Sequence, residues 1–169
     1  MKYPARVRTH DAEVKAWTEN ISGSALMDIV AALRRRIKVD RSHDIPYIAG
    51  YSRDGATIFI DRHMPHSLVY RAKRVDTDRF LLVHEIVEKA LLDQLGLHYL
   101  HAHQIALRIE QAAVRAAGIE WQVYNRFTKS KEKRIGDERL TKVPRDLDLT
   151  PYEDEHDFAT LRAMTVARR

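Results

Sequence analysis

The sequence contains no cysteine among its 169 residues. It can therefore form no disulfide bond, no thiolate metal cluster and no cysteine nucleophile. This excludes zinc fingers and cysteine proteases, and it leaves histidine and carboxylate side chains as the ligands for any metal ion. Hydrophobic residues make up 44% and charged residues 31% of the chain, which is an ordinary balance for a globular domain.

Long apolar segments are also missing, because nowhere do about 18 apolar residues follow one another. The first residues are partly basic, but no apolar run of the kind found in secretory signals follows them. We therefore expect a cytoplasmic protein that does not span a membrane. The chain length fits one compact domain of roughly 100–150 residues with a short appendage.

The net charge of +5 is concentrated in one segment, residues 126–145, which contains eight basic and three acidic residues. We accordingly divide the chain into a metal-binding domain, residues 1–125, and a basic helix with a C-terminal tail, residues 126–169. Clustered lysines and arginines can neutralise phosphates. Weak nucleic-acid binding through residues 126–145 is thus one hypothesis, although Phe127 is the one aromatic residue in that segment and such charge runs are commonly solvated surfaces.

The pattern of apolar residues predicts an α+β fold. Helical spacing over residues 22–38 predicts a first helix. Between residues 45 and 62, segments rich in tyrosine and isoleucine flank the turn signal Arg53-Asp54-Gly55, which is typical of a β-hairpin. Residues 67–73 predict another short strand.

Two neighbouring helices are predicted in the middle of the chain. The first spans residues 78–95 and is followed by Gly96, and the second spans residues 99–117 and is followed by Gly118; glycine is common just past a helix C-terminus. The short connection between them makes antiparallel neighbours of the two helices.

The remaining chain is less regular. A further helix is expected from residue 119 into the basic segment. Beyond Pro144, the tail contains Pro151 and several acidic residues, and we expect it to be loosely ordered or docked on the body of the protein.

The first central helix carries the sequence His84-Glu85-Ile86-Val87-Glu88. Residues four apart lie on one face of a helix, so His84 and Glu88 can bind the same metal ion. Glu85 lies about 100° further round the helix. Zinc proteases with the motif H-E-x-x-H place there the carboxylate that activates the attacking water, but the second histidine of that motif is a glutamate in this chain.

A third ligand is expected from the second central helix, where His103 shares a face with Tyr99 and Glu110. If this face meets His84 and Glu88, two histidines and one carboxylate bind the metal and leave a fourth position for water, as in catalytic zinc sites. Zinc is the expected metal, with Fe²⁺ or another divalent ion as the alternative, because these ions accept the same ligands. Glu110 is expected either to orient His103 or to be a solvated carboxylate.

These motifs resemble the zincin-like metallopeptidases, in which an edge strand precedes the metal-binding helix. They are also similar to a group of small uncharacterised bacterial and phage proteins in which H-E-x-x-E is followed by Y-x-x-A-H, here residues 99–103. The resemblance covers roughly residues 45–118. It implies a minimal zincin-like fold, with helices packed on a small β-hairpin or sheet, the three metal ligands named above and Glu85 as general base. It also implies that strand 56–61 is the edge strand along a substrate groove.

Several functions fit this sequence. The first is a zinc-dependent, peptidase-like hydrolase acting on a peptide or protein, with Glu85 as general base and Tyr99 donating to the developing oxyanion. The second is a non-catalytic metal-binding scaffold whose metal has a fourth ligand such as Glu110 or His101. The third is the nucleic-acid-binding accessory protein already considered. A purely structural interpretation instead pairs Glu85 with Lys89 on the helix surface.

Four other histidines lie close to the motifs in sequence, namely His63, His66, His98 and His101. We expect them at the protein surface rather than among the metal ligands.

Overall fold

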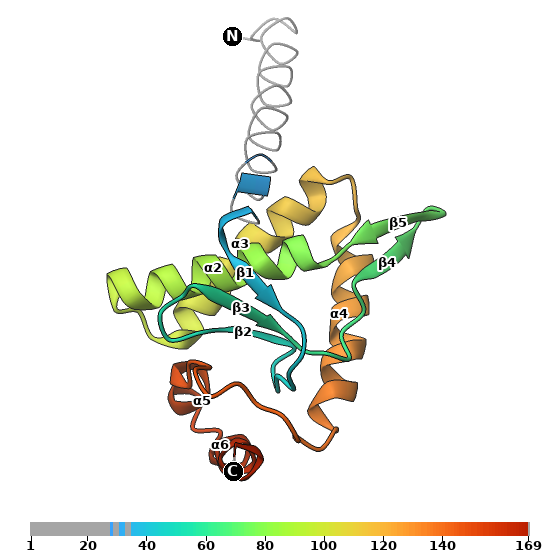
Figure 1. Cartoon of the computed structure of the whole chain (residues 1–169). Helices are drawn as coiled ribbons and strands as arrows, with labels where there is room; N and C mark the ends of the chain where they lie inside the picture. Colours follow the sequence, from blue (N-terminus) through green and yellow to red (C-terminus); the bar gives the residue numbers. More distant parts are fainter. Residues whose placement is uncertain (1–27, 29–30, 33–34, 169) are drawn as a thin grey trace, which may run out of the picture.

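A computed structural model describes residues 28, 31–32 and 35–168 of the chain (Figure 1). The described part is α+β, with helices packed on a small sheet, as the sequence predicts. Its elements are β1 (Lys38–Asp40), β2 (Ala49–Tyr51), β3 (Thr57–Ile60), β4 (Ser67–Tyr70), β5 (Lys73–Asp76), α2 (Asp78–Leu95), α3 (Tyr99–Ala116), α4 (Trp121–Gly136), α5 (Thr150–Asp154) and α6 (Phe158–Ala167). The helix predicted over residues 22–38 falls largely outside the described residues, and Lys38 at its end belongs to β1 instead.

The three-stranded sheet has the order β1-β3-β2, with β3 parallel to β1 and antiparallel to β2. The predicted hairpin is therefore confirmed as β2 and β3. Gly55 in its turn has a φ of 70°, a left-handed conformation that glycine adopts without steric cost. The prediction that segment 56–61 is an edge strand is wrong, because β3 has a hydrogen-bonded neighbour on each side.

Strand β3 is buried on both faces, which explains its continuous apolar sequence. Side chains alternate between the two faces of a strand. Ile58 and Ile60 pack in a cluster with Leu82 of α2. Phe59 points the other way and packs in a cluster with Tyr152 of the C-terminal segment. One face of β3 therefore packs toward α2 and the other toward the C-terminal segment (Figure 1), and α5 also contacts α3.

The central helices form as predicted and pack against each other. Helix α2 ends at Gly96, whose φ is 60° and whose N–H donates to the carbonyl of Leu92. Helix α3 starts after His98, whose ring accepts a hydrogen bond from the backbone N–H of Leu100, and it ends one residue earlier than predicted, with Gly118 at a φ of 75°. Two caps therefore fix the short connection between the helices.

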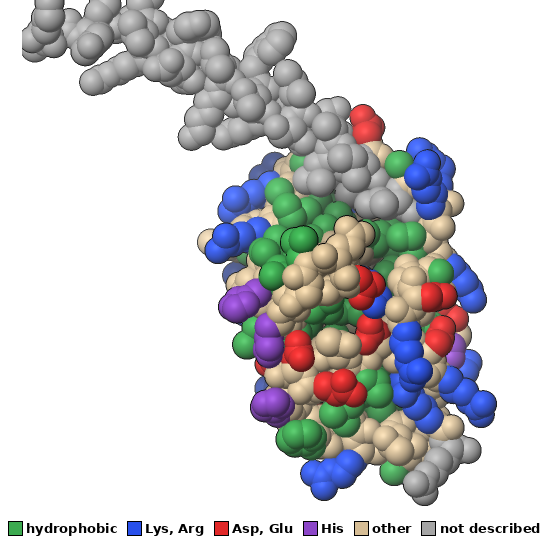
Figure 2. Space-filling model, turned by 90° about the vertical axis from the view of Figure 1, so that its left-hand side faces the viewer, with side chains coloured by type: hydrophobic (Ala, Val, Ile, Leu, Met, Phe, Trp, Pro, Cys, Tyr) green, Lys and Arg blue, Asp and Glu red, His purple; other side chains and the backbone are tan. Residues whose placement is uncertain are grey.

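The remaining elements surround this central unit. The predicted strand over residues 67–73 is a two-stranded hairpin, since β4 ends at Tyr70 and β5 begins at Lys73. Of the two states expected for the tail, the docked one is observed, because Leu147 and Met164 are buried in the cluster around Phe59. Figure 2 shows one face of the protein, on which both acidic and basic side chains are exposed. Among the described helices, none is long and apolar enough to cross a membrane.

Asp44 attaches the C-terminal segment to the body of the protein. Its carboxylate accepts hydrogen bonds from the backbone N–H groups of Thr141, at 2.6 Å, and Lys142, at 2.8 Å, and it pairs with Arg62 at 2.7 Å. Burial raises the pKa of Asp44, but these two hydrogen bonds outweigh burial and hold the pKa below its ordinary value. The ionised side chain therefore contributes stability near neutral pH that is lost as the pH falls through the lowered pKa.

We predict that Asp44→Asn lowers the free energy of unfolding by about 1.5–3 kcal/mol at pH 7, because hydrogen bonds to a charged group are lost. Urea denaturation measures this difference, which should shrink when both proteins are compared near pH 3. Replacing the exposed Asp137 by asparagine should change stability by less than about 0.5 kcal/mol. Equal stabilities of Asp44→Asn and the unmodified protein at pH 7 would show that this attachment is unimportant.

Candidate metal centre

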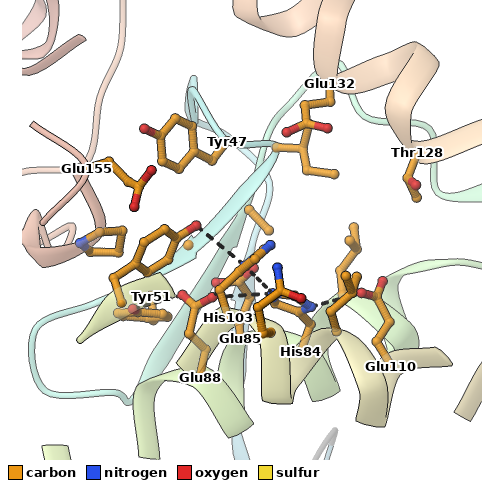
Figure 3. A pocket seen from close by; sticks show the side chains of 18 of the residues that line it. Tyr47, Tyr51, His84, Glu85, Glu88, His103, Glu110, Thr128, Glu132 and Glu155 are labelled. Carbon is orange, nitrogen blue, oxygen red and sulfur yellow. Dashed lines mark hydrogen bonds and ion pairs between the residues drawn. The ribbon is translucent and has the colours of Figure 1, made fainter. Parts of the chain in front are cut away.

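A cavity of about 620 Å³ lies beside the edge strand β2 and is lined by residues of α2, α3, α4 and α5 (Figure 3). Strand β2 contributes Ala49, Gly50 and Tyr51 to its wall. The strand that sequence analysis placed along the groove, residues 56–61, does not line this cavity; its partner in the hairpin does. A cavity of this size accommodates a small molecule or a few residues of a peptide.

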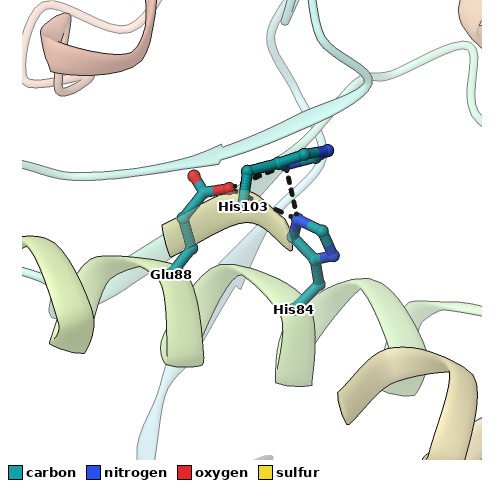
Figure 4. A group of neighbouring side chains, drawn as sticks. All are labelled: His84, Glu88 and His103. Carbon is teal, nitrogen blue, oxygen red and sulfur yellow. Dashed lines mark hydrogen bonds and ion pairs between the residues drawn. The ribbon is translucent and has the colours of Figure 1, made fainter. Parts of the chain in front are cut away.

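The side chains of His84, Glu88 and His103 meet at the floor of this cavity and could together hold a metal ion (Figure 4). We call these three residues the triad. The Nε2 atom of His84 lies 3.1 Å from Nδ1 of His103 and 3.3 Å from Oε2 of Glu88, and Nδ1 of His103 lies 2.9 Å from the same oxygen. The packing of α2 against α3 thus brings together the three ligands expected from the sequence.

The spacing of these atoms fits a small divalent cation. Ligand atoms about 2.0–2.2 Å from a tetrahedral zinc ion lie roughly 3.3–3.6 Å apart. The observed separations of 2.9, 3.1 and 3.3 Å approach this range. The three atoms need to move apart by only a few tenths of an ångström to surround such an ion, which is within side-chain freedom.

Hydrogen bonds cannot account for all the short contacts within the triad at the same time. Nδ1 of His103 has three polar neighbours, at 2.9 Å from Glu88, 3.1 Å from His84 and 3.5 Å from the hydroxyl of Tyr99. A ring nitrogen carries at most one hydrogen and donates it in one direction. A cation at the centre of the triad would instead interact favourably with all the ligand atoms at once.

The orientation of His84 is fixed by hydrogen bonds that run from its ring to Glu110 and from Glu110 to Tyr124. Its Nδ1 donates to Oε2 of Glu110 at 2.9 Å, and the other oxygen of Glu110 accepts from the hydroxyl of Tyr124 at 2.6 Å. With Nδ1 as the donor, the lone pair of Nε2 faces the triad. Sequence analysis expected Glu110 to orient His103 or to be solvated, and both alternatives are wrong, because Glu110 is buried and contacts His84.

Glu88 is held in a similar way. Its Oε1 accepts a hydrogen bond from the hydroxyl of Tyr51 at 3.0 Å, which leaves Oε2 directed at the two histidines. Burial raises the pKa of Glu88, but hydrogen bonds from His103 and His84 outweigh burial and keep the pKa below its ordinary value. The carboxylate is therefore ionised and able to bind a cation at neutral pH.

The same negative charges act on His84. Burial lowers its pKa, but hydrogen bonds to Glu110 and Glu88 outweigh burial and raise the pKa above the ordinary histidine value. This local field favours a positive charge at the triad, whether a proton or a metal ion, so the two compete for the site.

Glu85 lies next to the triad and also lines the cavity (Figure 3). Its exposed fraction is 7%, and among the described residues its carboxylate receives no hydrogen bond and forms no ion pair. Burial, followed by repulsion from Glu88, raises its pKa. The structural interpretation that paired Glu85 with Lys89 is wrong, since Lys89 instead contacts Asp93 at 2.7 Å and Asp148 at 2.8 Å.

The other predicted residues fall into two groups. Tyr99 is buried, lines the cavity and lies with its hydroxyl near His103. Four histidines lie at the surface as expected, with no part in the triad: His63, His66, His98 and His101.

Sequence analysis missed the two tyrosines that support the ligands. Tyr51 is the last residue of β2, next to the hairpin turn. Because side chains alternate along a strand, its position could have placed this side chain on the face toward α2. The contact of Tyr124 with Glu110 could not be recognised from the sequence, because it depends on how α4 packs against α3.

We predict about one tightly bound divalent metal ion per chain, because three ligands on two packed helices are oriented before binding. Removing a ligand in His84→Ala or His103→Ala should strongly weaken zinc binding, measured by titration calorimetry after chelator treatment. His66→Ala removes an exposed histidine and should leave affinity unchanged. Equal losses in all three variants, or no metal in protein purified without a histidine tag, would show that the triad is not the site.

The hydrogen bond between His84 and Glu110 leads to a separate prediction. Glu110→Gln keeps the size of the side chain but removes the charge that orients the imidazole, so zinc affinity should fall about 10–100-fold. Glu120→Gln, an equivalent change on an exposed glutamate away from the cavity, is the matched control. An unchanged affinity in Glu110→Gln would mean that His84 needs no such partner.

Comparisons of the chain with protein-family models, with curated protein sequences and with solved structures gave no match. The case for a metal centre therefore rests on the chemistry and geometry of this chain's own residues. These residues form a group of two imidazoles and one carboxylate, with His84 and Glu88 buried and His103 partly exposed, that could hold a divalent ion. Beside it lies Glu85, whose carboxylate has no hydrogen-bond partner among the described residues.

Proposed function

We propose that this chain is a metal-dependent hydrolase of peptidase-like type, with zinc held by the triad and Glu85 as general base. The observation that carries the proposal is the position of Glu85, a buried carboxylate without a hydrogen-bond partner among the described residues, beside three ligands that face a cavity. Burying such a group is costly, and among the described residues only the positive charge of His84 offsets this cost. A catalytic role accounts for the position, because a carboxylate there can accept a proton from a water molecule at the triad.

The number of ligands favours catalysis over a closed scaffold. Structural zinc sites have four protein ligands, whereas catalytic sites have three and an open position. Glu110 and His101 were the candidates for a fourth ligand, but Glu110 is engaged behind His84 and His101 is exposed. A zinc ion in the triad would supply a Lewis acid that polarises a carbonyl and lowers the pKa of water.

Glu85 then performs the proton transfers of hydrolysis. It accepts a proton from the attacking water as the new carbon–oxygen bond forms at the substrate carbonyl. As the carbon–nitrogen bond breaks, Glu85 returns this proton to the leaving amine, so the carboxylate is regenerated. No other described carboxylate beside the triad is equally available, because Glu88 and Glu110 are both hydrogen-bonded.

Tyr99 is suited to stabilise the negative charge that develops on the carbonyl oxygen. Burial, followed by the charges of Glu88 and Glu85, raises the pKa of its hydroxyl, which therefore stays protonated. A neutral hydroxyl at the edge of the triad donates a hydrogen bond to an oxyanion.

The edge of the sheet supports a peptide or other amide as the substrate. On either side of β2, the carbonyl of Ile48 accepts from Asp61 and the N–H of Ser52 donates to Thr57, so by alternation the backbone groups of Ala49 and Tyr51 face away from β3. The carbonyl of Tyr51 accepts from the N–H of Asp148, which covers one end of this edge. Ala49 lines the cavity and offers the remaining backbone groups to an extended substrate.

We predict that Glu85→Gln leaves zinc content nearly unchanged and lowers the rate of peptide hydrolysis by ~10²–10⁴, the usual contribution of a positioned base. Release of free amines from a mixed peptide library, normalised to bound zinc, measures this effect. Glu120→Gln should keep full activity, and His84→Ala should lose both zinc and activity. A fully active Glu85→Gln protein, or one that loses its zinc, would refute this role.

A further inference from the structure

The wall of the cavity opposite the triad carries two glutamates that the proposed reaction does not use. Glu132 comes from α4 and Glu155 follows α5, and Figure 3 shows them with Tyr47 between them, across the cavity from the metal ligands. Both glutamates are exposed, and neither forms an ion pair within the described part of the chain. Two uncompensated negative charges therefore border the space that a substrate would enter.

Tyr47 connects these charges to an aromatic surface. Its hydroxyl donates to Asp157 at 3.1 Å, and its ring lies against the ring of Tyr152, with centroids 4.4 Å apart. The pKa of Tyr47 is raised by burial and then by the charges of Asp157, Glu155 and Glu132, which means that all three carboxylates act on its hydroxyl. Carboxylates around an aromatic ring are an arrangement that attracts cations.

The charge of this wall contrasts with that of the whole chain, which is +5. Among the described residues, Lys129 is the one lysine or arginine that lines the cavity, against six acidic residues, three of which belong to the proposed metal site. Of the other three, Asp148 is neutralised by Lys89, so Glu132 and Glu155 provide the free negative charge. Apart from Lys129, the basic residues of the described part of the chain lie outside this lining, and an anionic substrate would meet repulsion here.

We propose that Tyr47, Glu132 and Glu155 form a subsite for a positively charged side chain, lysine or arginine, of the peptide substrate. This inference rests on the proposed function, because it assigns a substrate class to the same cavity. A lysine side chain places its ammonium group at the end of a long apolar stem. The stem would lie along the Tyr47 ring while the ammonium group interacts with the two carboxylates, so both parts of the side chain are accommodated.

Binding can be tested without hydrolysis by using the zinc-loaded full-length Glu85→Gln protein. The probes are three fluorescent hexapeptides that are identical except for a central lysine, norleucine or glutamate, and fluorescence anisotropy measures their Kd. Norleucine keeps the apolar stem of lysine and lacks the ammonium group, so the ratio of the two Kd values isolates the charge. We expect the lysine peptide to bind about tenfold more tightly than the norleucine peptide and the glutamate peptide to bind most weakly.

The two carboxylates are then removed by Glu132→Gln and Glu155→Gln in the Glu85→Gln background. The preference for lysine should disappear, while binding of the norleucine peptide stays unchanged. A control with the same change in net charge, Glu120→Gln with Glu153→Gln, replaces exposed glutamates that do not line the cavity and should keep the preference. Raising the salt concentration to 1 M shortens the Debye length to about 3 Å and should also reduce the preference.

The outcomes separate this inference from the proposed function. Equal Kd values for the three peptides, a preference that survives removal of both carboxylates, or no binding by any peptide at 1 mM would overturn the subsite. Failure of zinc-loaded unmodified protein to hydrolyse any peptide would instead refute the hydrolase, even if lysine is still preferred in binding.

Discussion

The contact between α2 and α3 is the constraint on which the rest of the site depends. His84 and Glu88 are placed by helical periodicity alone, but they become part of a three-ligand group only because His103 of the next helix packs against them. The left-handed Gly96 and the cap of His98 keep the connection short, which fixes how the two helices align. A shift of one turn, about 5.4 Å, would separate the ligand atoms beyond the reach of one ion.

This contact places several charges in the protein interior, which is unfavourable unless each is compensated. Glu110 is compensated by His84 and Tyr124, and Glu88 by Tyr51 and the two histidines. Glu85 differs, since only the neighbouring positive charge of the site offsets its burial. The fold thus holds a group that is unfavourable in isolation, and such a group is typical of a site where charge changes during function.

Much of this arrangement could be predicted from local sequence. The bounds of α2, the hairpin around Gly55 and the placement of His84 and Glu88 on one helix face follow from periodicity, glycine positions and residue spacing. Strand order could not be predicted, because β1 is short and its pairing with β3 is not local in sequence. This pairing makes β3, which was expected at the edge, the central strand of the sheet. The partner of Lys89 was also missed, since Asp148 lies 59 residues away and is brought near only by the docked tail.

The docked tail also explains why the cavity has its particular charge. Helices α2 and α3 supply the triad and Glu85, while Glu132 comes from α4, in the segment that sequence analysis described as basic, and Glu155 follows α5 in the acidic tail. Within residues 126–145 the basic side chains outnumber the acidic ones, yet Glu132 is among the residues of α4 that line the cavity. Net charge along the sequence therefore says little about the field inside the cavity, which depends on which side of a helix each charge occupies. The face of α4 toward the cavity and the turn after α5 together set the charge of the cavity wall opposite the triad.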